Sequence, residues 1–157
     1  GTEYQPLTLP CKLQRNILMI EVLALFSTAI LFGGMTLYSF GFAPLIFHAL
    51  GQAEAGKVLR IAFPWYYLFI IMSSIFCGVL LISSRPDCSM IMLGIALIAI
   101  YTRQVLIKKI NQARDNELAS ASTSGRRFAL LHSFSVALNF LQLIATGYVL
   151  SRFTSVF

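Results

Sequence analysis

The chain has 157 residues, of which 57% are hydrophobic and 11% are charged, and its mean hydropathy is +0.77. These values exclude an ordinary soluble domain and are typical of a polytopic membrane protein. The formal net charge of +6 is expected beside the membrane, in contact with anionic lipid, and no basic patch elsewhere indicates a nucleic-acid partner.

The N-terminal part begins with an arm, residues 1–15, that is mixed in polarity and predicted to be irregular. The apolar segment after it predicts a helix over about residues 16–42, long enough to cross a bilayer of roughly 30 Å. Pro44 disfavours the helical conformation of the residue before it, so this helix is expected to end or kink there. Residues 43–61 are then predicted to be a connector, in which residues 53–60 can form a short surface helix.

Three further apolar segments predict helices over about residues 62–83, 88–115 and 128–151. Together with the first helix they predict an all-α fold, a four-transmembrane-helix bundle, as a single membrane domain over residues 1–157. Residues 84–87 are expected to form a tight turn between the second and third helices.

Residues at the ends of the predicted spans are candidate contacts to lipid or to a partner. An aromatic group, Trp65, Tyr66 and Tyr67, stands at the start of the second span, and such rings favour the headgroup level. Arg103 and Arg114 lie on the basic extension of the third helix, where an anionic lipid is the natural contact. The same extension would also suit an anionic ligand or a docked partner, and the sequence does not distinguish these alternatives.

The distribution of positive charge predicts the orientation of the chain. With four spans both termini lie on one side, and the two connectors, residues 43–61 and 108–127, carry more Lys and Arg than the other side. The positive-inside rule then places the connectors in the cytoplasm and both termini outside, and a bacterial inner membrane is favoured.

A stripe of polar residues marks the fourth apolar segment. The stripe residues recur every three or four positions, which places them on one face of a helix: His132, Ser135, Asn139, Gln142 and Thr146. We expect this face to turn toward other helices, because polar groups are costly against lipid. Contact with a transported substrate would need a water-filled cavity, so hydrogen bonds between helices, worth roughly 0.6–2 kcal/mol each, are the favoured role.

Glu21 is the one acidic residue inside a predicted span. An intramembrane carboxylate can serve a proton relay or an ion site, because its burial is otherwise costly. The simpler interpretation, which we favour, is that Glu21 lies near the outer interface and snorkels or pairs with Arg15, Arg85 or Arg152.

The histidines and cysteines are the candidate ligands for a metal or a haem. His132 and His48 lack partners at ligand spacing, so packing is favoured for His132. A soft-metal site of Cys77 with Met72 or Met90 ranks below simple core packing. We predict no cofactor and no metal. Cys11 and Cys88 would both face outward and could pair, which the sequence leaves open.

Three groups of motifs, in this order, resemble the transmembrane protein 205-like family, whose bacterial members carry a four-span domain of unknown function. The resemblance covers roughly Asn16 to Leu150 and rests on the following stretches: Gly33-Gly34-Met35, Tyr38-Ser39-Phe40 and Ala43-Pro44-Leu45-Ile46-Phe47; Ala55-Gly56 and Phe63-Pro64-Trp65-Tyr66-Tyr67; Asn111-Gln112-Ala113-Arg114-Asp115, Leu131-His132, Ser135-Val136, Leu138-Asn139 and Gln142-Leu143. It implies a four-helix integral membrane protein with no established catalytic activity. Similar copper- and haem-handling families often carry a histidine in the first span, whereas residues 20–32 here hold Glu21 and no histidine.

We therefore expect a non-enzymatic integral membrane protein, because no nucleophile with a base and an orienting group is visible. Its expected role is that of an accessory or assembly subunit that packs against a larger membrane complex, with membrane lipids and other membrane-protein subunits as partners. The alternative is a small transporter or metal/cation handler that uses Glu21 and the polar face of the fourth helix.

Overall fold

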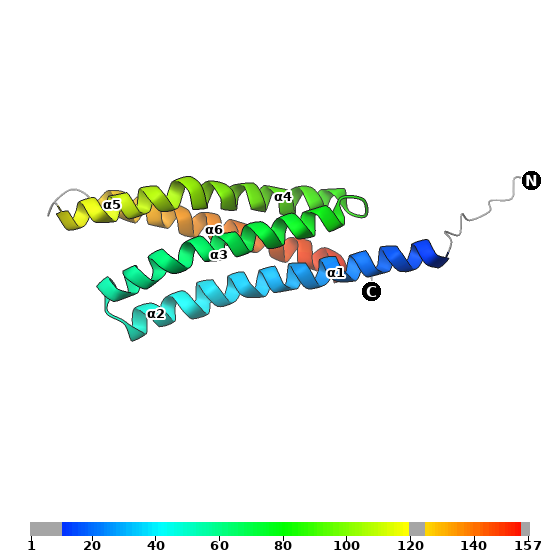
Figure 1. Cartoon of the computed structure of the whole chain (residues 1–157), viewed down its shortest axis with the longest axis horizontal. Helices are drawn as coiled ribbons and strands as arrows, with labels where there is room; N and C mark the ends of the chain where they lie inside the picture. Colours follow the sequence, from blue (N-terminus) through cyan, green and yellow to red (C-terminus); the bar gives the residue numbers. More distant parts are fainter. Residues whose placement is uncertain (1–10, 120–124, 155–157) are drawn as a thin grey trace, which may run out of the picture.

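A computed structural model describes residues 11–119 and 125–154 as four long helical rods, laid side by side in alternating directions (Figure 1). The rods are built from eight helical elements: α1 (Cys11–Thr36), π-helical η1 (Leu37–Phe42), α2 (Ala43–Ala49), α3 (Gln52–Leu81), α4 (Pro86–Tyr101), π-helical η2 (Thr102–Leu106), α5 (Ile107–Ala119) and α6 (Gly125–Thr154). The all-α prediction is confirmed, and the described residues contain no strand.

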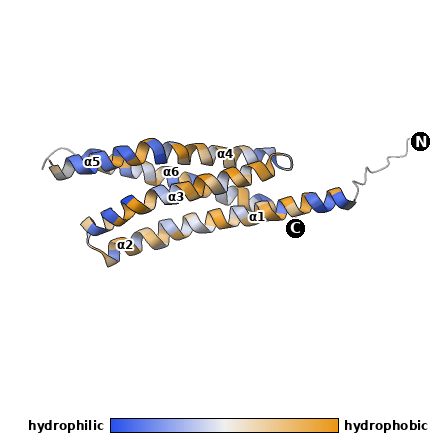
Figure 2. Ribbon diagram, in the orientation of Figure 1, coloured by the Kyte–Doolittle hydropathy of each residue, from blue (hydrophilic) through white to orange (hydrophobic). Residues whose placement is uncertain are grey.

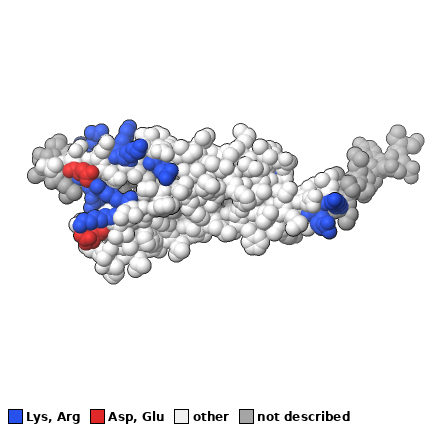
Figure 3. All heavy atoms as spheres, in the orientation of Figure 1, with Lys and Arg blue, Asp and Glu red and all other residues white. Residues whose placement is uncertain are grey.

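Among the residues that the structure describes, four helices are long and apolar enough to cross a membrane: Lys12–Ala49, Ala53–Leu81, Pro86–Asn116 and Arg126–Thr154. Apolar residues fill most of their length, while hydrophilic residues concentrate in α5 and at the ends of α1 and α3 (Figure 2). Lys and Arg lie toward the two ends of the molecule, and the visible face between them is uncharged (Figure 3). The predicted four-transmembrane-helix bundle is confirmed, and the chain has the character of a multi-pass membrane protein.

The first rod is longer than predicted, because the helix does not end at Pro44. The N–H of Ala43 donates to the carbonyl of Tyr38, which widens the helix immediately before the proline. A wider turn relieves the clash of the proline ring with the preceding backbone, so α2 continues to Ala49. The predicted connector over residues 43–61 is wrong, and the chain turns at residues 50–51 instead.

The second rod begins earlier than predicted, and Pro64 lies inside α3 rather than in its first turn. The expected surface helix over residues 53–60 is the start of this rod. Ala55 and Leu59 are buried there, 0% and 5% exposed, so helix packing extends the rod beyond the apolar segment. At the opposite end of α3 the turn lies just before Pro86, which occupies the first turn of α4.

The part of the interior that α1 contributes is formed by small and medium side chains at helical spacing. On α1 the buried residues recur every three or four positions, at Ala24, Thr28, Leu31 and Met35. Gly34, one of two adjacent glycines, is a close-packing site: a Cβ there would lie 2.7 Å from Cε1 of the Phe69 ring on α3. A Cβ on Gly33 would meet nothing within 4 Å. The absence of a side chain at Gly34 therefore lets α1 pack closely against α3.

Candidate functional site

The polar stripe of α6 turns into the bundle, as its spacing indicates. Ser135, Gln142 and Thr146 are 8%, 1% and 0% exposed, and Asn139 is half-buried. His132 differs from the other four because it is exposed, with its ring stacked on Phe128 at a centroid distance of 5.8 Å. The stripe therefore has an inner part, made of four residues, and one member near the start of α6.

Asn139 connects three rods through its side-chain amide. It accepts a hydrogen bond from the Tyr66 hydroxyl at 2.7 Å and donates one to Ser39 Oγ at 2.8 Å. Ser39 lies in the π-helical stretch η1, and the Tyr66 ring stacks on Tyr38 at 3.9 Å. The amide is engaged in helix association.

Two of the aromatic residues predicted to contact lipid are instead part of the interior. Tyr66 is 7% exposed and Tyr67 is 1% exposed, whereas Trp65 is 70% exposed and remains a candidate lipid contact. The hydroxyl of Tyr67 lies 3.5 Å from Ser135 Oγ on α6. The prediction failed because the rod starts well before the apolar segment, so these rings lie inside the helix and not at its mouth.

Gln142 connects α6 to α4. Its side-chain Nε2 donates to the backbone carbonyl of Ile95 at 3.0 Å. Thr146 Oγ1 donates to the backbone carbonyl of Gln142 at 2.8 Å. Gln142 Oε1 is buried without a hydrogen-bond partner in the structure described. The side-chain nitrogen of Gln142 therefore joins α6 to α4, whereas the side-chain oxygen accepts no hydrogen bond in the structure described.

Glu21 pairs with Arg85, one of the three arginines proposed for it. Arg85 Nε lies 3.0 Å from Glu21 Oε2, and both side chains are largely buried. Arg85 Nη1 also donates to the Arg152 carbonyl at 2.8 Å, and its guanidinium lies 5.0 Å from the Phe153 ring centroid. We call this cluster the Arg85 end of the bundle. It fastens α1 and the last turn of α6 to the turn between α3 and α4.

The sulfur atoms considered for a soft-metal site are not brought together. Cys77 is buried, with Sγ 3.0 Å from Thr28 Oγ1, whereas Met72 and Met90 are 63% and 74% exposed. Cys88 is buried as a free thiol, and the side chain of Cys11 lies outside the described part of the structure, so their pairing is not addressed. Within residues 11–119 and 125–154, no three His, Cys, Asp or Glu residues group as metal ligands.

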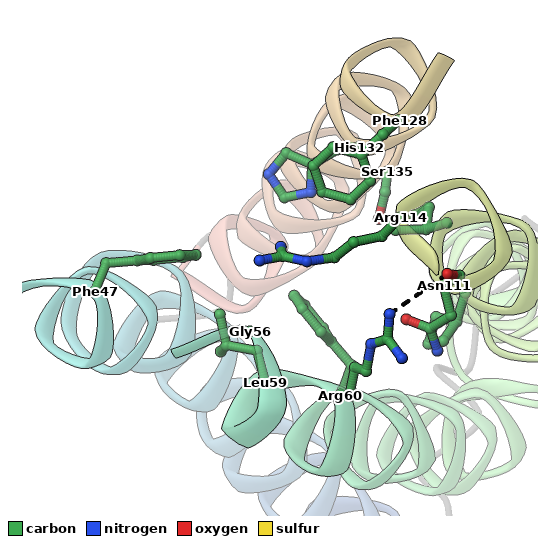
Figure 4. Close-up of a pocket in the computed structure, with 12 residues that line it drawn as sticks. Phe47, Gly56, Leu59, Arg60, Asn111, Arg114, Phe128, His132 and Ser135 are labelled. Carbon is green, nitrogen blue, oxygen red and sulfur yellow. Dashed lines mark hydrogen bonds between the residues drawn. The ribbon is translucent and has the colours of Figure 1, made fainter. Parts of the chain in front are cut away.

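A cavity of ≈ 240 Å³ lies at the other end of the bundle, which we call the basic end. Its walls come from α2, α3, α5 and α6, and Ile107 and Ile110 are among the residues that line it. Its main lining residues are labelled in Figure 4: Phe47, Gly56, Leu59, Arg60, Asn111, Arg114, Phe128, His132 and Ser135. Arg114, one of the sequence candidates, extends its guanidinium into the space between α3 and α6 (Figure 4).

Arg103, the other candidate on the third rod, lies apart from this cavity lining. It lies in η2 and its Nε donates to the carbonyl of Pro64 at 3.2 Å. Arg103 therefore binds the backbone of α3 at Pro64, which lies inside that helix. Sequence reasoning gave no site role to Arg60 or Gly56, because both fall in the region that the sequence predicts to be a connector.

Comparison with known proteins places the chain in a family. A family model described as a domain of unknown function (DUF4149) matches residues 26–156, and this covers most of the chain, which therefore belongs to that family. No curated protein and no solved structure gives a match.

Proposed function

We propose that this member of the family is a non-enzymatic integral membrane protein that serves as an accessory or assembly subunit and packs against a larger membrane complex. The proposal is supported by how the chain uses its polar groups. Asn139, Gln142 and Glu21 all bind other parts of the same bundle. Inside the described bundle their chemistry is directed to adhesion between helices.

The observation that carries the proposal is the apolar start of α1. Residues 17–20 are four consecutive apolar residues, and Ile17, Leu18, Met19 and Ile20 are 41%, 60%, 60% and 39% exposed. Four residues span a full helical turn, so this turn is apolar on every side. It precedes Glu21, and in Figure 1 the start of α1 extends beyond the turn between α3 and α4. A helix that is apolar all round is covered either by lipid or by protein, and we propose that an apolar helix of a partner protein covers this turn.

The alternative, a small transporter or cation handler, has weaker support. Both carboxylate oxygens of Glu21 lie within hydrogen-bond distance of Arg85 Nε, at 3.3 and 3.0 Å. A carboxylate held by a fixed guanidinium has little remaining charge to offer a passing cation. Under this alternative Glu21→Gln would change flux in reconstituted vesicles while the protein stays folded, and unchanged flux would reject it.

The proposed orientation and relationship follow from the sequence. We place the connectors in the cytoplasm of a bacterial inner membrane with both termini outside, and we relate the chain to the transmembrane protein 205-like family through its ordered motifs. A cysteine-free variant carrying Gly51→Cys would react with an impermeant maleimide only after lysis, whereas Ser84→Cys would react in intact cells. The reverse pattern would invert the proposed orientation.

Site-specific photocrosslinking tests the accessory role. A photoreactive residue at position 18, in the full chain in its native membrane, is expected to give a covalent adduct with another membrane protein. The matched control is position 90 on α4, because Met90 is even more exposed, at 74%, but lies on a different rod. Lipid adducts alone at both positions would refute the proposal, and an adduct of twice the mass of the chain would replace the partner by a second copy.

A further inference from the structure

The cavity at the basic end combines charge with an apolar wall, and the proposed accessory role does not use it. Arg60 and Arg114 line it from α3 and α5 (Figure 4). Arg60 is held by Asp115, with Nη2 2.5 Å from Oδ1, and it also donates to the carbonyl of Asn111. Among the described residues that line the cavity, Arg60 and Arg114 carry charge and none is a carboxylate. Such a lining favours an anionic ligand, and guanidinium geometry suits the oxygens of phosphate or carboxylate.

Gly56 provides a second, independent observation. A Cβ at this position would lie 2.8 Å from Arg114 Nη2 and 3.0 Å from its Cζ, closer than real Cβ atoms approach other atoms. The guanidinium thus occupies space that only glycine leaves open on this face of α3. On its other side it lies 5.4 Å from the centroid of the Phe128 ring. The long side chain of Arg114 is consequently held in one direction, toward the cavity.

Apart from Asn111, His132 and Ser135, the rest of the lining is apolar, and this apolar part indicates what the anion is attached to. Phe47 and Phe63 lie beside the arginines, and a second hollow of ≈ 150 Å³ shares both residues and continues toward Tyr66 and Asn139. The main cavity, ≈ 240 Å³, is smaller than the roughly 300–1,000 Å³ that encloses a whole small-molecule ligand. It can therefore enclose a charged head and the beginning of an apolar tail, but not the rest of a long tail.

The position of the cavity agrees with a molecule that resides in the bilayer. Phe47 lies in the last turns of α2 and Gly56 in the second turn of α3, close to where the chain turns. Phe47 and His132 stand on different sides of the cavity in Figure 4, and both side chains are exposed, so the cavity opens between α2 and α6. Arginines near the ends of membrane helices lie at headgroup depth.

We propose that this cavity is a binding site for an anionic phospholipid, with the phosphate bound by Arg114 and Arg60 and the start of the acyl chains against Phe47 and Phe63. The tails continue between α2 and α6 into the surrounding bilayer. Phosphatidylglycerol has the required chemistry, whereas phosphatidylcholine carries the same phosphate beside a cation and should bind more weakly.

Native mass spectrometry of the full chain in detergent tests the site by counting retained lipids. With phosphatidylglycerol and phosphatidylcholine of identical acyl chains, we expect about a tenfold preference for the anionic lipid, as charge-assisted hydrogen bonds imply. Arg114→Gln should remove most of this preference. Lys109→Gln is the matched control, because Lys109 is an exposed cation on the same helix and its loss should leave the preference unchanged.

Gly56→Ala tests the geometry while it keeps every charge. Its new methyl group would displace the Arg114 guanidinium and is expected to lower the preference several-fold, by less than Arg114→Gln does. Gly94→Ala is the control, because a Cβ there meets nothing within 4 Å. Gly56→Ala also provides the decisive measurement if Arg114→Gln does not yield a monodisperse helical protein.

Three outcomes would overturn the proposal. Equal retention of the two lipids by the unmodified chain would remove the ionic selectivity. An equal loss in Arg114→Gln and Lys109→Gln would show that overall charge, and not the cavity, attracts the lipid. Displacement of phosphatidylglycerol by an equal concentration of inorganic phosphate would show that the site binds free phosphate and that the apolar part of the lipid does not contribute to binding.

Discussion

Arg85 and Arg114 stand toward opposite ends of the same bundle and have different surroundings. The Arg85 side chain is only 16% exposed and binds Glu21, the carbonyl of Arg152 and the face of Phe153. Arg114 lies over the Phe128 ring and against Gly56, and it lines a cavity. The first arginine closes one end of the bundle, whereas the second leaves the other end hollow.

The difference shows that the role of an arginine at a membrane boundary depends on the side chains around it and not on its depth in the membrane alone. At the Arg85 end the cation and its carboxylate come from within the chain, so the cluster serves stability. At the basic end Arg60 is bound by Asp115, which does not line the cavity, whereas Arg60 and Arg114 both do. Removing each arginine should therefore affect different properties: folding at one end and lipid binding at the other.

The largest expected effect is that of Arg85→Gln on stability. The change leaves the largely buried Glu21 carboxylate without its guanidinium, which should cost on the order of 3 kcal/mol. Unfolding in detergent, followed by circular dichroism, measures it. The double variant Glu21→Gln with Arg85→Gln should recover much of the loss, since no uncompensated charge remains. If the double variant is as unstable as Arg85→Gln alone, the closed end is held by other contacts.

Gly34→Ala should destabilise the contact between the first two rods, because the new methyl group meets the Phe69 ring at 2.7 Å. Overpacking of this kind costs roughly 1–3 kcal/mol. Gly33→Ala, at the adjacent position with open space, should be neutral or slightly stabilising in the same unfolding measurement. Equal effects at the two positions would contradict the close packing of α1 on α3.

The fold and the inward polar face could be predicted from sequence for a simple reason. Apolar length is set by the bilayer, and polar spacing is set by the helix, so both are local properties that the chain displays directly. The pairing of Glu21 with an arginine could also be predicted from the sequence, since few cations lie near the same depth in the membrane. The choice of Arg85 over Arg15 and Arg152 required the packing of α1 on the turn before α4.

The basic cavity could not be found this way, because the prediction used Pro44 as a boundary. The π-helical stretch before it lets the helix continue past Pro44, and the bond from Asn139 to Ser39 connects this stretch to α6, neither of which a local pattern contains. Once residues 43–61 were taken for a connector, Phe47, Gly56 and Arg60 could not be assigned to helix faces. The same error moved Tyr66 and Tyr67 to the lipid surface.

Asn139→Leu should weaken the middle of the bundle, between the two ends, without preventing membrane insertion. It removes two hydrogen bonds that connect α6 to Tyr66 and Ser39, and the expected loss is about 1–2 kcal/mol. Tyr66→Phe removes only one of them and should cost about half as much. Insertion is checked by protease protection and stability by detergent unfolding. A loss in Tyr66→Phe that equals that in Asn139→Leu would place the whole effect on the tyrosine.

Arg114→Gln should have the smallest effect on stability and so draws the sharpest contrast with Arg85→Gln. Its contact with the Phe128 ring is worth about 0.5–1 kcal/mol, and the cavity can admit water when the charge is lost. The same variant should nevertheless lose the stabilisation that added phosphatidylglycerol gives the unmodified chain, because a ligand stabilises only a state that binds it. Thermal unfolding with and without this lipid separates the two effects. A large loss of stability in the absence of lipid would mean that Arg114, like Arg85, holds the helices together, and the contrast between the two ends would disappear.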